Sequence, residues 1–175
     1  MPQTEKGLTG KGFEFLAEME RMHMIVDVSH LSDKGFWDIV EHGTRPFAAS
    51  HSNCRALAPH TRNLTDEMIR ALSERGGIAG LNYYAPFLDT DPTHPENCRS
   101  TVELIAKHAA HYKQVGGAQM IALGSDFDGI DGPHQLENAA FLPLLADALR
   151  KEGFTEDEVE GIYYRNAMRF FEENL

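Results

Sequence analysis

The sequence predicts an α/β fold with a parallel sheet, because short apolar runs alternate with amphipathic helical segments along the chain. Four apolar runs, at residues 24–28, 45–49, 77–81 and 120–124, each stop at a polar residue able to bind a metal or hold a substrate. In parallel α/β proteins the functional groups gather at the carboxyl ends of the strands. The four runs are therefore predicted to be strands that share an active site at their ends.

Helices are expected before and between the first three runs. Thr9 is a cap signal for an amphipathic helix that leads into the first run. Ser32 offers an N-cap to a second helix, which Gly43 ends. Thr65 starts a third helix, and the glycine pair 76–77 terminates it before the third run. This order predicts helix and strand in strict alternation.

The second half of the chain continues the alternation. Ser100 and Glu103 have the spacing of a capping box, which predicts the start of a helix that leads to the fourth run. Pro143 is tolerated in the next helix if it lies in the first turn. Thr155 and Glu158 form a second capping box, which predicts one terminal helix with its apolar side buried. These helices complete a chain of βαβ units with right-handed crossovers.

An irregular stretch separates the third run from Ser100. It carries Pro86, Pro92 and Pro95, and we expect it to be a loop over a site. The 175 residues are expected to form one domain, spanning 1–175. Because an eight-stranded barrel needs ~250 residues, the chain is predicted to be either a small open doubly wound domain or half of a barrel.

Charge and composition exclude several classes of partner. A formal net charge of -11 argues against nucleic acid and anionic membrane surfaces. No apolar stretch approaches membrane-spanning length, and the amino terminus lacks the apolar core of a signal peptide, so we expect a cytoplasmic protein. Cys54 and Cys98 are not a CxxC pair, which predicts two reduced thiols.

The residues that follow the runs indicate a metal site. His30 and His51 end two neighbouring predicted strands, and imidazole together with carboxylate is a ligand set that zinc favours. Asp126 follows the fourth run, where a carboxylate can bind metal or carry a proton. Arg62 has the forked geometry that suits a substrate carboxylate. These four residues are the candidates for the chemistry.

Four ordered blocks of sequence carry a family resemblance. Residues 25–30, 50–57, 62–67 and 124–129, with the leading triplet 7–9, closely resemble the membrane dipeptidase family, which is renal dipeptidase-like and is also called peptidase family M19. The order and spacing of the blocks agree, and the resemblance covers essentially the whole chain. It implies the carboxyl-terminal half of a TIM-type (β/α)8 metal-dependent hydrolase barrel, namely strands five to eight with their helices.

The resemblance also implies roles for particular residues. His30 and His51 resemble the two histidines on the second zinc ion of a two-zinc site. Asp126 resembles the aspartate beside the first zinc, which also carries a proton to the leaving amine of a dipeptide substrate. Water activated by the metal ions would attack the scissile carbonyl.

For the substrate, the resemblance implies a second group of residues. Arg62 resembles the arginine that binds the substrate carboxylate, and Asn82 and Tyr83 fall where the family lines its substrate pocket. A dipeptide is the implied substrate.

The chain departs from the family in what it lacks. The family's amino-terminal half supplies a His-x-Asp pair and a glutamate that bridges both metals, and no His-x-Asp occurs in the 175 residues. Three hypotheses follow. The chain is a partial zinc-dependent dipeptidase that needs its amino-terminal half, a non-catalytic half-barrel that self-associates through unpaired sheet edges, or a mononuclear hydrolase that uses His30, His51 and Asp126.

Overall fold

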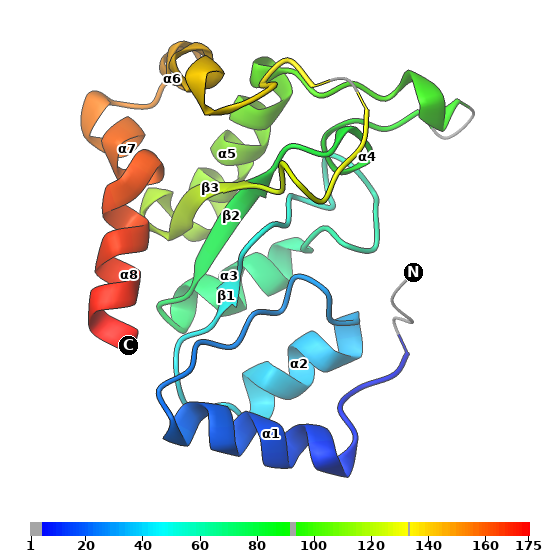
Figure 1. Cartoon of the computed structure of the whole chain (residues 1–175), viewed down its shortest axis with the longest axis vertical. Coiled ribbons are helices and arrows are strands. Elements are labelled where there is room, and N and C mark those ends of the chain that lie inside the picture. Colours follow the sequence, from blue (N-terminus) through cyan, green and yellow to red (C-terminus); the bar gives the residue numbers. More distant parts are fainter. Residues whose placement is uncertain (1–4, 92–93, 133) are drawn as a thin grey trace.

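A parallel three-stranded sheet forms the centre of the molecule (Figure 1). The structure is a computed structural model, and it describes residues 5–91, 94–132 and 134–175. The strand order is β1 (Ala48–Ala49), β2 (Ile78–Asn82) and β3 (Ile121–Ser125), with both pairs parallel. The predicted α/β class with a parallel sheet is confirmed.

Helices lie before, between and after the strands. In order along the sequence they are α1 (Gly10–Arg21), α2 (Asp33–His42), α3 (Asp66–Glu74), α4 (Ala85–Leu88), α5 (Val102–Gly116), α6 (Leu142–Lys151), α7 (Glu156–Glu160) and α8 (Asn166–Asn174). Short 3-10 turns occupy Pro95–Asn97, Ala118–Met120 and Ala139–Phe141. None of the helices among the described residues combines the length and the apolar character needed to cross a membrane.

The first predicted strand is reduced to a single bridge. Asp27 pairs with Ala48 in parallel, through the hydrogen bonds Ala48 N to Val26 O (2.9 Å) and Val28 N to Ala48 O (2.8 Å). Since β1 itself is only two residues long, it offers too short an edge for a longer ladder. The expectation of a full strand at residues 24–28 was wrong, but the segment still lies in parallel beside β1.

Most of the predicted helix starts are confirmed, because each depends on local hydrogen bonds. The side chains of Thr9, Ser32, Thr65 and Thr155 all accept a hydrogen bond from the first turn of their helices. The capping box predicted at Ser100 was wrong. Thr101 is the N-cap of α5, and the Ser100 hydroxyl donates instead to the carbonyl of Tyr83 (2.6 Å).

The irregular stretch and the carboxyl terminus also differ from expectation. The predicted loop holds α4, which includes Pro86, whereas Pro92 lies outside the described residues. The single terminal helix is interrupted by a π-helical turn, Gly161–Arg165. The Asn166 side chain explains the interruption, because its amide donates to the carbonyls of Ala118 (3.0 Å) and Ile121 (2.8 Å) and so ties the helix to β3.

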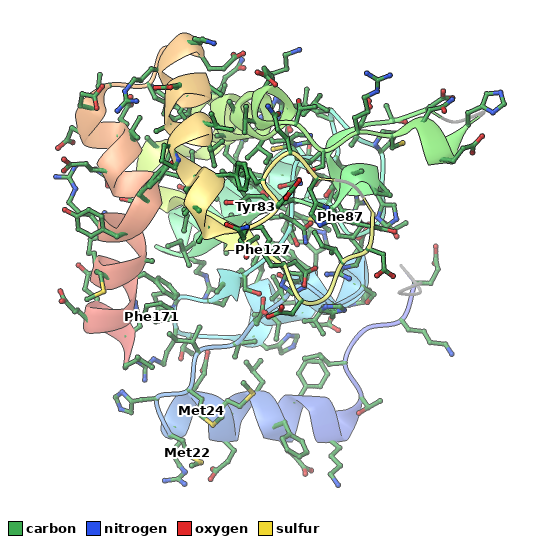
Figure 2. The ribbon with its side chains drawn as sticks, turned by 45° about the horizontal axis from the view of Figure 1, so that its top comes forward. Met22, Met24, Tyr83, Phe87, Phe127 and Phe171 are labelled. Carbon is green, nitrogen blue, oxygen red and sulfur yellow. The ribbon has the colours of Figure 1, made fainter. Side chains whose placement is uncertain are left out.

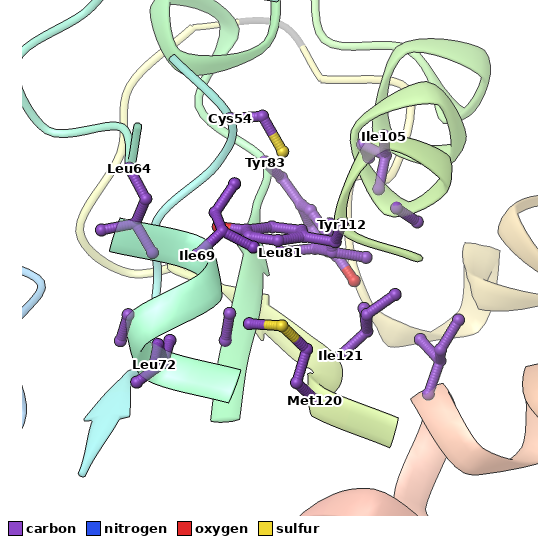
Figure 3. Packing of buried hydrophobic residues seen from close by; sticks show 14 of the residues in the cluster. Cys54, Leu64, Ile69, Leu72, Leu81, Tyr83, Ile105, Tyr112, Met120 and Ile121 are labelled. Carbon is purple, nitrogen blue, oxygen red and sulfur yellow. The ribbon is translucent and has the colours of Figure 1, made fainter. Parts of the chain in front are cut away.

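One face of the sheet packs against α3 and α5 to form the main core (Figure 3). Ile69, Leu81, Tyr112 and Ile121 are fully buried there. The Tyr112 hydroxyl donates to the carbonyl of Ser52 (2.8 Å), which satisfies its only polar atom inside this core. The core therefore fixes β2 and the chain that follows β1 in one arrangement.

The opposite face of the sheet brings three backbones into close contact. A Cβ added to Gly80 would lie 1.9 Å from the Ser50 carbonyl oxygen, and one added to Gly124 would lie 2.2 Å from the same atom. Only glycine allows this approach. The two glycines thereby place Ser50, which follows β1, directly against β2 and β3.

Candidate active site

His30 and His51 converge at the ends of two adjacent parallel segments. Their Nε2 atoms lie 2.9 Å apart, and the rings are tilted by 53° with centroids 4.9 Å apart. Two imidazoles on one tetrahedral zinc, with Zn–N bonds of ~2.0–2.1 Å, have their nitrogens roughly 3.3 Å apart. A shift of a few tenths of an ångström would accommodate the ion, so the pair fits two ligands of one zinc.

A serine and a carboxylate support His51 from behind. The Ser50 hydroxyl lies 2.7 Å from His51 Nδ1 and 2.5 Å from Asp27 Oδ2. Partial desolvation alone would raise the pKa of Asp27, but hydrogen bonds from Ser50 and Ser29 outweigh it and hold that pKa below its usual value. Asp27 is therefore ionised at neutral pH. The residue also keeps an exposed surface.

The ionisation of His51 suits a metal ligand. Burial lowers the pKa of His51 below its usual value, and the negative charges of Asp126 and Asp27 oppose this shift without reversing it. The neutral imidazole that results is the form that binds zinc.

Asp126 lies at the end of β3 and faces the same site. Its Oδ2 accepts a hydrogen bond from the side-chain amide of Asn82 (3.1 Å), which ends β2. Asp126 has a positive φ of 71°, and its carbonyl accepts the amide of Gly129 (3.0 Å) in a tight turn. This turn holds the carboxylate where it interacts electrostatically with His51 and Arg62.

Arg62 is held at the edge of this group. Its Nε donates to the Ser29 carbonyl (2.5 Å), and its guanidinium lies 5.4 Å from the ring centroid of Phe87 in α4. The Nη2 atom is buried without a hydrogen-bond partner among the described residues. The described residues therefore leave one donor of the guanidinium without an acceptor.

Tyr83 is not brought to the site. Its side chain is fully buried and packs edge-on against Phe127, with ring centroids 5.4 Å apart (Figure 2). Side chains alternate along a strand, so Tyr83 points away from the side on which Asn82 contacts Asp126. Of the six residues predicted for the site, the structure gathers His30, His51, Arg62, Asn82 and Asp126, and it gives Tyr83 a position in the core.

Metal ligands are incomplete in the part of the chain that the structure describes. Residues 5–91, 94–132 and 134–175 contain no group of three or more histidine, cysteine, aspartate or glutamate side chains arranged to hold a metal ion. His30 and His51 thus form a pair without a third ligand from these residues. A complete zinc site needs further ligands or water.

Two residues of the site had no role in the sequence analysis. Asp27 and Ser50 were recognised only as letters of the family blocks, yet they support His51 directly. The available signals were a carboxylate inside an apolar run, Asp27, and a serine directly before the site histidine, Ser50. Sequence spacing could not show that the two segments lie side by side.

Comparison with known proteins identifies relatives over the whole chain. The family model of membrane dipeptidase (peptidase family M19) matches residues 1–174. An uncharacterised protein from the pqqA 5' region of Klebsiella pneumoniae is 38% identical over 96% of this chain and 61% of its own length. The dipeptidase tcpJ of Claviceps purpurea is 33% identical over 95% of this chain and 38% of its own length.

The structure of this chain is also similar to solved structures of metallopeptidases. A metallopeptidase from Rhodobacter sphaeroides, crystallised with a phosphinate mimic of the dipeptide L-Ala-D-Ala, superposes with a TM-score of 0.90 at 32% identity. The match covers 99% of this chain and 49% of that one. Dipeptidase AC, a metallopeptidase of family M19, gives a TM-score of 0.88 at 33% identity, with 99% and 51% covered. The chain thus spans about half the length of these solved relatives.

Proposed function

Because this chain belongs to the membrane dipeptidase family, peptidase family M19, we propose that it forms part of a zinc-dependent dipeptidase. In this proposal its sheet corresponds to strands five to eight of a TIM-type barrel, and its helices to those of the carboxyl-terminal half. The parallel sheet and the coverage of about half of each solved relative support this assignment. The substrate proposed is a dipeptide, the class that the names of several relatives state.

The convergence of His30 and His51 carries the proposal. Their Nε2 atoms are 2.9 Å apart, and His51 has the neutral form that a ligand requires. When bound, zinc acts as a Lewis acid that activates water and polarises a carbonyl. The two imidazoles would hold one ion, and a second ion would need ligands from outside these residues.

Asp126 and Arg62 supply the remaining chemistry of the proposal. The Asp126 carboxylate lies beside His51 and is oriented by Asn82, so it is placed to carry a proton to the leaving amine. The guanidinium of Arg62 would bind the carboxylate of the dipeptide, and its Nη2 has no acceptor among the described residues. Binding one end of the substrate in this way fixes its peptide bond relative to the other groups.

We propose further that full activity requires an amino-terminal half of the barrel in addition to these residues. The absence of a third metal ligand among the described residues supports this requirement. The mononuclear alternative would use His30, His51 and Asp126 alone. The other alternative is a non-catalytic half-barrel that self-associates through the unpaired edges of its sheet.

One experiment separates these possibilities. Dipeptide hydrolysis is measured with zinc for the purified chain alone and after mixing with the separately produced amino-terminal half of an M19 relative. The proposal expects turnover only in the mixture, and loss of that turnover in Asp126→Asn. Zinc-dependent turnover by the chain alone would contradict complementation and favour the mononuclear hydrolase, whereas a stable dimer that is inactive in both assays would favour the self-associating module.

A further inference from the structure

We propose that Asp27, acting through the Ser50 hydroxyl, is a positioning residue that fixes the tautomer of His51 and aims its Nε2 lone pair at the metal position. The inference rests on the proposed function for its metal, because zinc is the ligand that this lone pair would bind. It concerns residues of this chain alone. Neither Asp27 nor Ser50 would touch the metal or the substrate.

The geometry is a continuous chain of hydrogen bonds. Asp27 Oδ1 accepts the backbone amides of Ser29 and Ser50, each at 3.0 Å, and Oδ2 accepts the Ser50 hydroxyl at 2.5 Å. The same hydroxyl oxygen lies 2.7 Å from Nδ1 of His51. Three donors thus converge on one carboxylate, which holds it in place at the end of its segment.

The number of protons available decides which group donates in each hydrogen bond. A carboxylate only accepts hydrogen bonds, and a serine hydroxyl has a single proton to donate. Since Ser50 gives that proton to Asp27, its oxygen has only lone pairs left for His51. Nδ1 of His51 must therefore carry the proton, and Nε2 must carry the lone pair.

These donor and acceptor roles distinguish the two histidines. His51 Nε2 is an acceptor, so across the 2.9 Å contact the donor is Nε2–H of His30 in the metal-free protein. His51 is then preset as a ligand, whereas His30 must move its proton to Nδ1 when zinc binds. Zinc ligands held by such an outer group typically bind the metal ~10–100-fold more tightly than when that group is removed.

Ser29 adds a second tie between the same segments. Its hydroxyl accepts the backbone amide of His51 (3.0 Å), while its own amide donates to Asp27. Backbone and side chain of His51 are therefore both positioned from the segment that carries Asp27. This arrangement leaves the imidazole little freedom to rotate away from His30.

Two variants disrupt this chain of hydrogen bonds in different ways. Asp27→Asn preserves the shape, but the new amide donates to Ser50 and so turns the serine proton toward His51. This reversal predicts the Nε2–H tautomer of His51, with a proton where the metal would bind. Ser50→Ala removes the hydroxyl that links Asp27 to His51. Ser50→Thr retains a hydroxyl at this position. Asp66→Asn is the matched control, because Asp66 contacts His111 (2.7 Å) away from this site.

The tautomer is read by histidine ¹⁵N chemical shifts on the metal-free full chain at pH 8. We expect Nδ1–H at His51 in the wild type, in Ser50→Thr and in Asp66→Asn. We expect predominantly Nε2–H in Asp27→Asn and a substantial Nε2–H population in Ser50→Ala. A wild-type His51 that is mainly Nε2–H, or a tautomer that neither variant changes, would overturn the inference.

Zinc titration of the same samples gives the second readout. Asp27→Asn and Ser50→Ala should weaken zinc binding ~10–100-fold, and Ser50→Thr should restore most of it. Equal zinc affinity in all variants would overturn the metal-positioning role. If the wild type has the expected tautomer but binds no zinc, the proposed metal site fails while the link from Asp27 to His51 stands, so the two failures are distinguishable.

Discussion

The Nε2 atoms of His30 and His51 lie 2.9 Å apart although the residues are 21 positions apart in sequence. The contact depends on the parallel pairing of the segment around Asp27 with β1, which brings the two segment ends to the same edge of the sheet. It also depends on Ser50, which two glycines allow to sit against β2 and β3. The geometry of the site is therefore a consequence of backbone packing.

Gly124→Ala tests that dependence. The added Cβ would lie 2.2 Å from the Ser50 carbonyl, which is backbone and cannot rotate away. We expect a loss of about 3 kcal/mol or more in the free energy of unfolding, measured by urea denaturation. Gly10→Ala is the control, because a Cβ there meets nothing within 4 Å. Equal stability of the two variants would contradict the close approach.

Two buried tyrosines should respond oppositely to loss of the hydroxyl. Tyr112→Phe leaves the Ser52 carbonyl without its donor and should cost about 1–2 kcal/mol of unfolding free energy. The buried hydroxyl of Tyr83 has no partner among the described residues, so Tyr83→Phe should be neutral or stabilising.

The same Tyr83 variant tests its predicted role in substrate binding. Because the side chain is fully buried, dipeptide hydrolysis by the reconstituted enzyme should keep its wild-type KM. A large rise in KM for Tyr83→Phe would show that the hydroxyl reaches the substrate after all.

His108 should make the fold sensitive to acid. Burial lowers its pKa to about 4, and its Nδ1 accepts the amide of Cys54 in the neutral form. In the unfolded chain the pKa is about 6.5, so the unfolded state binds the proton first as pH falls. Stability is therefore lost between about pH 6.5 and pH 4, by up to about 3 kcal/mol.

His108→Gln provides the comparison for this pH dependence. Glutamine retains an acceptor and a donor but does not titrate, so the variant should lose stability less steeply between pH 6.5 and pH 5. Urea denaturation of both proteins across this range measures the difference. Parallel stability curves would show that His108 does not contribute.

Arg62 should act on substrate binding more than on turnover. Arg62→Lys keeps the charge but loses the planar fork, so we expect KM for a dipeptide to rise ~10–100-fold with a smaller change in kcat in the reconstituted enzyme. Arg55→Lys is the control, because Arg55 makes a bidentate pair with Asp33 (2.7 and 2.8 Å). Arg55→Lys should lower the stability of the fold and leave KM unchanged. A fall in kcat alone for Arg62→Lys would contradict the proposed role.

Local signals in the sequence predicted most of the secondary structure. The caps at Thr9, Ser32, Thr65 and Thr155 depend on residues within one helical turn, and all four are confirmed. The failures came from tertiary contacts. Ser100 lost its capping role to a contact with the Tyr83 carbonyl, and the terminal helix is broken where Asn166 bonds to β3.

The site was predictable in part for the same reason. Strand ends are visible in sequence, so His30, His51, Asn82 and Asp126 could be assigned to one edge of the sheet. The face on which each side chain lies was not visible, and Tyr83 was therefore included although it belongs to the core. The support of His51 by Asp27 and Ser50 crosses two segments and required the structure.

Zinc content of the purified chain tests the central claim most directly. After equilibration with zinc and removal of unbound ion, the wild type and the control His111→Ala should each retain about one zinc ion per chain. His30 and His51 would hold this ion, and water would fill the remaining positions of its four-coordinate shell. His30→Ala and His51→Ala should each lose it while remaining folded by circular dichroism. Zinc retained by both His30→Ala and His51→Ala, or no zinc on the folded wild type, would contradict the account.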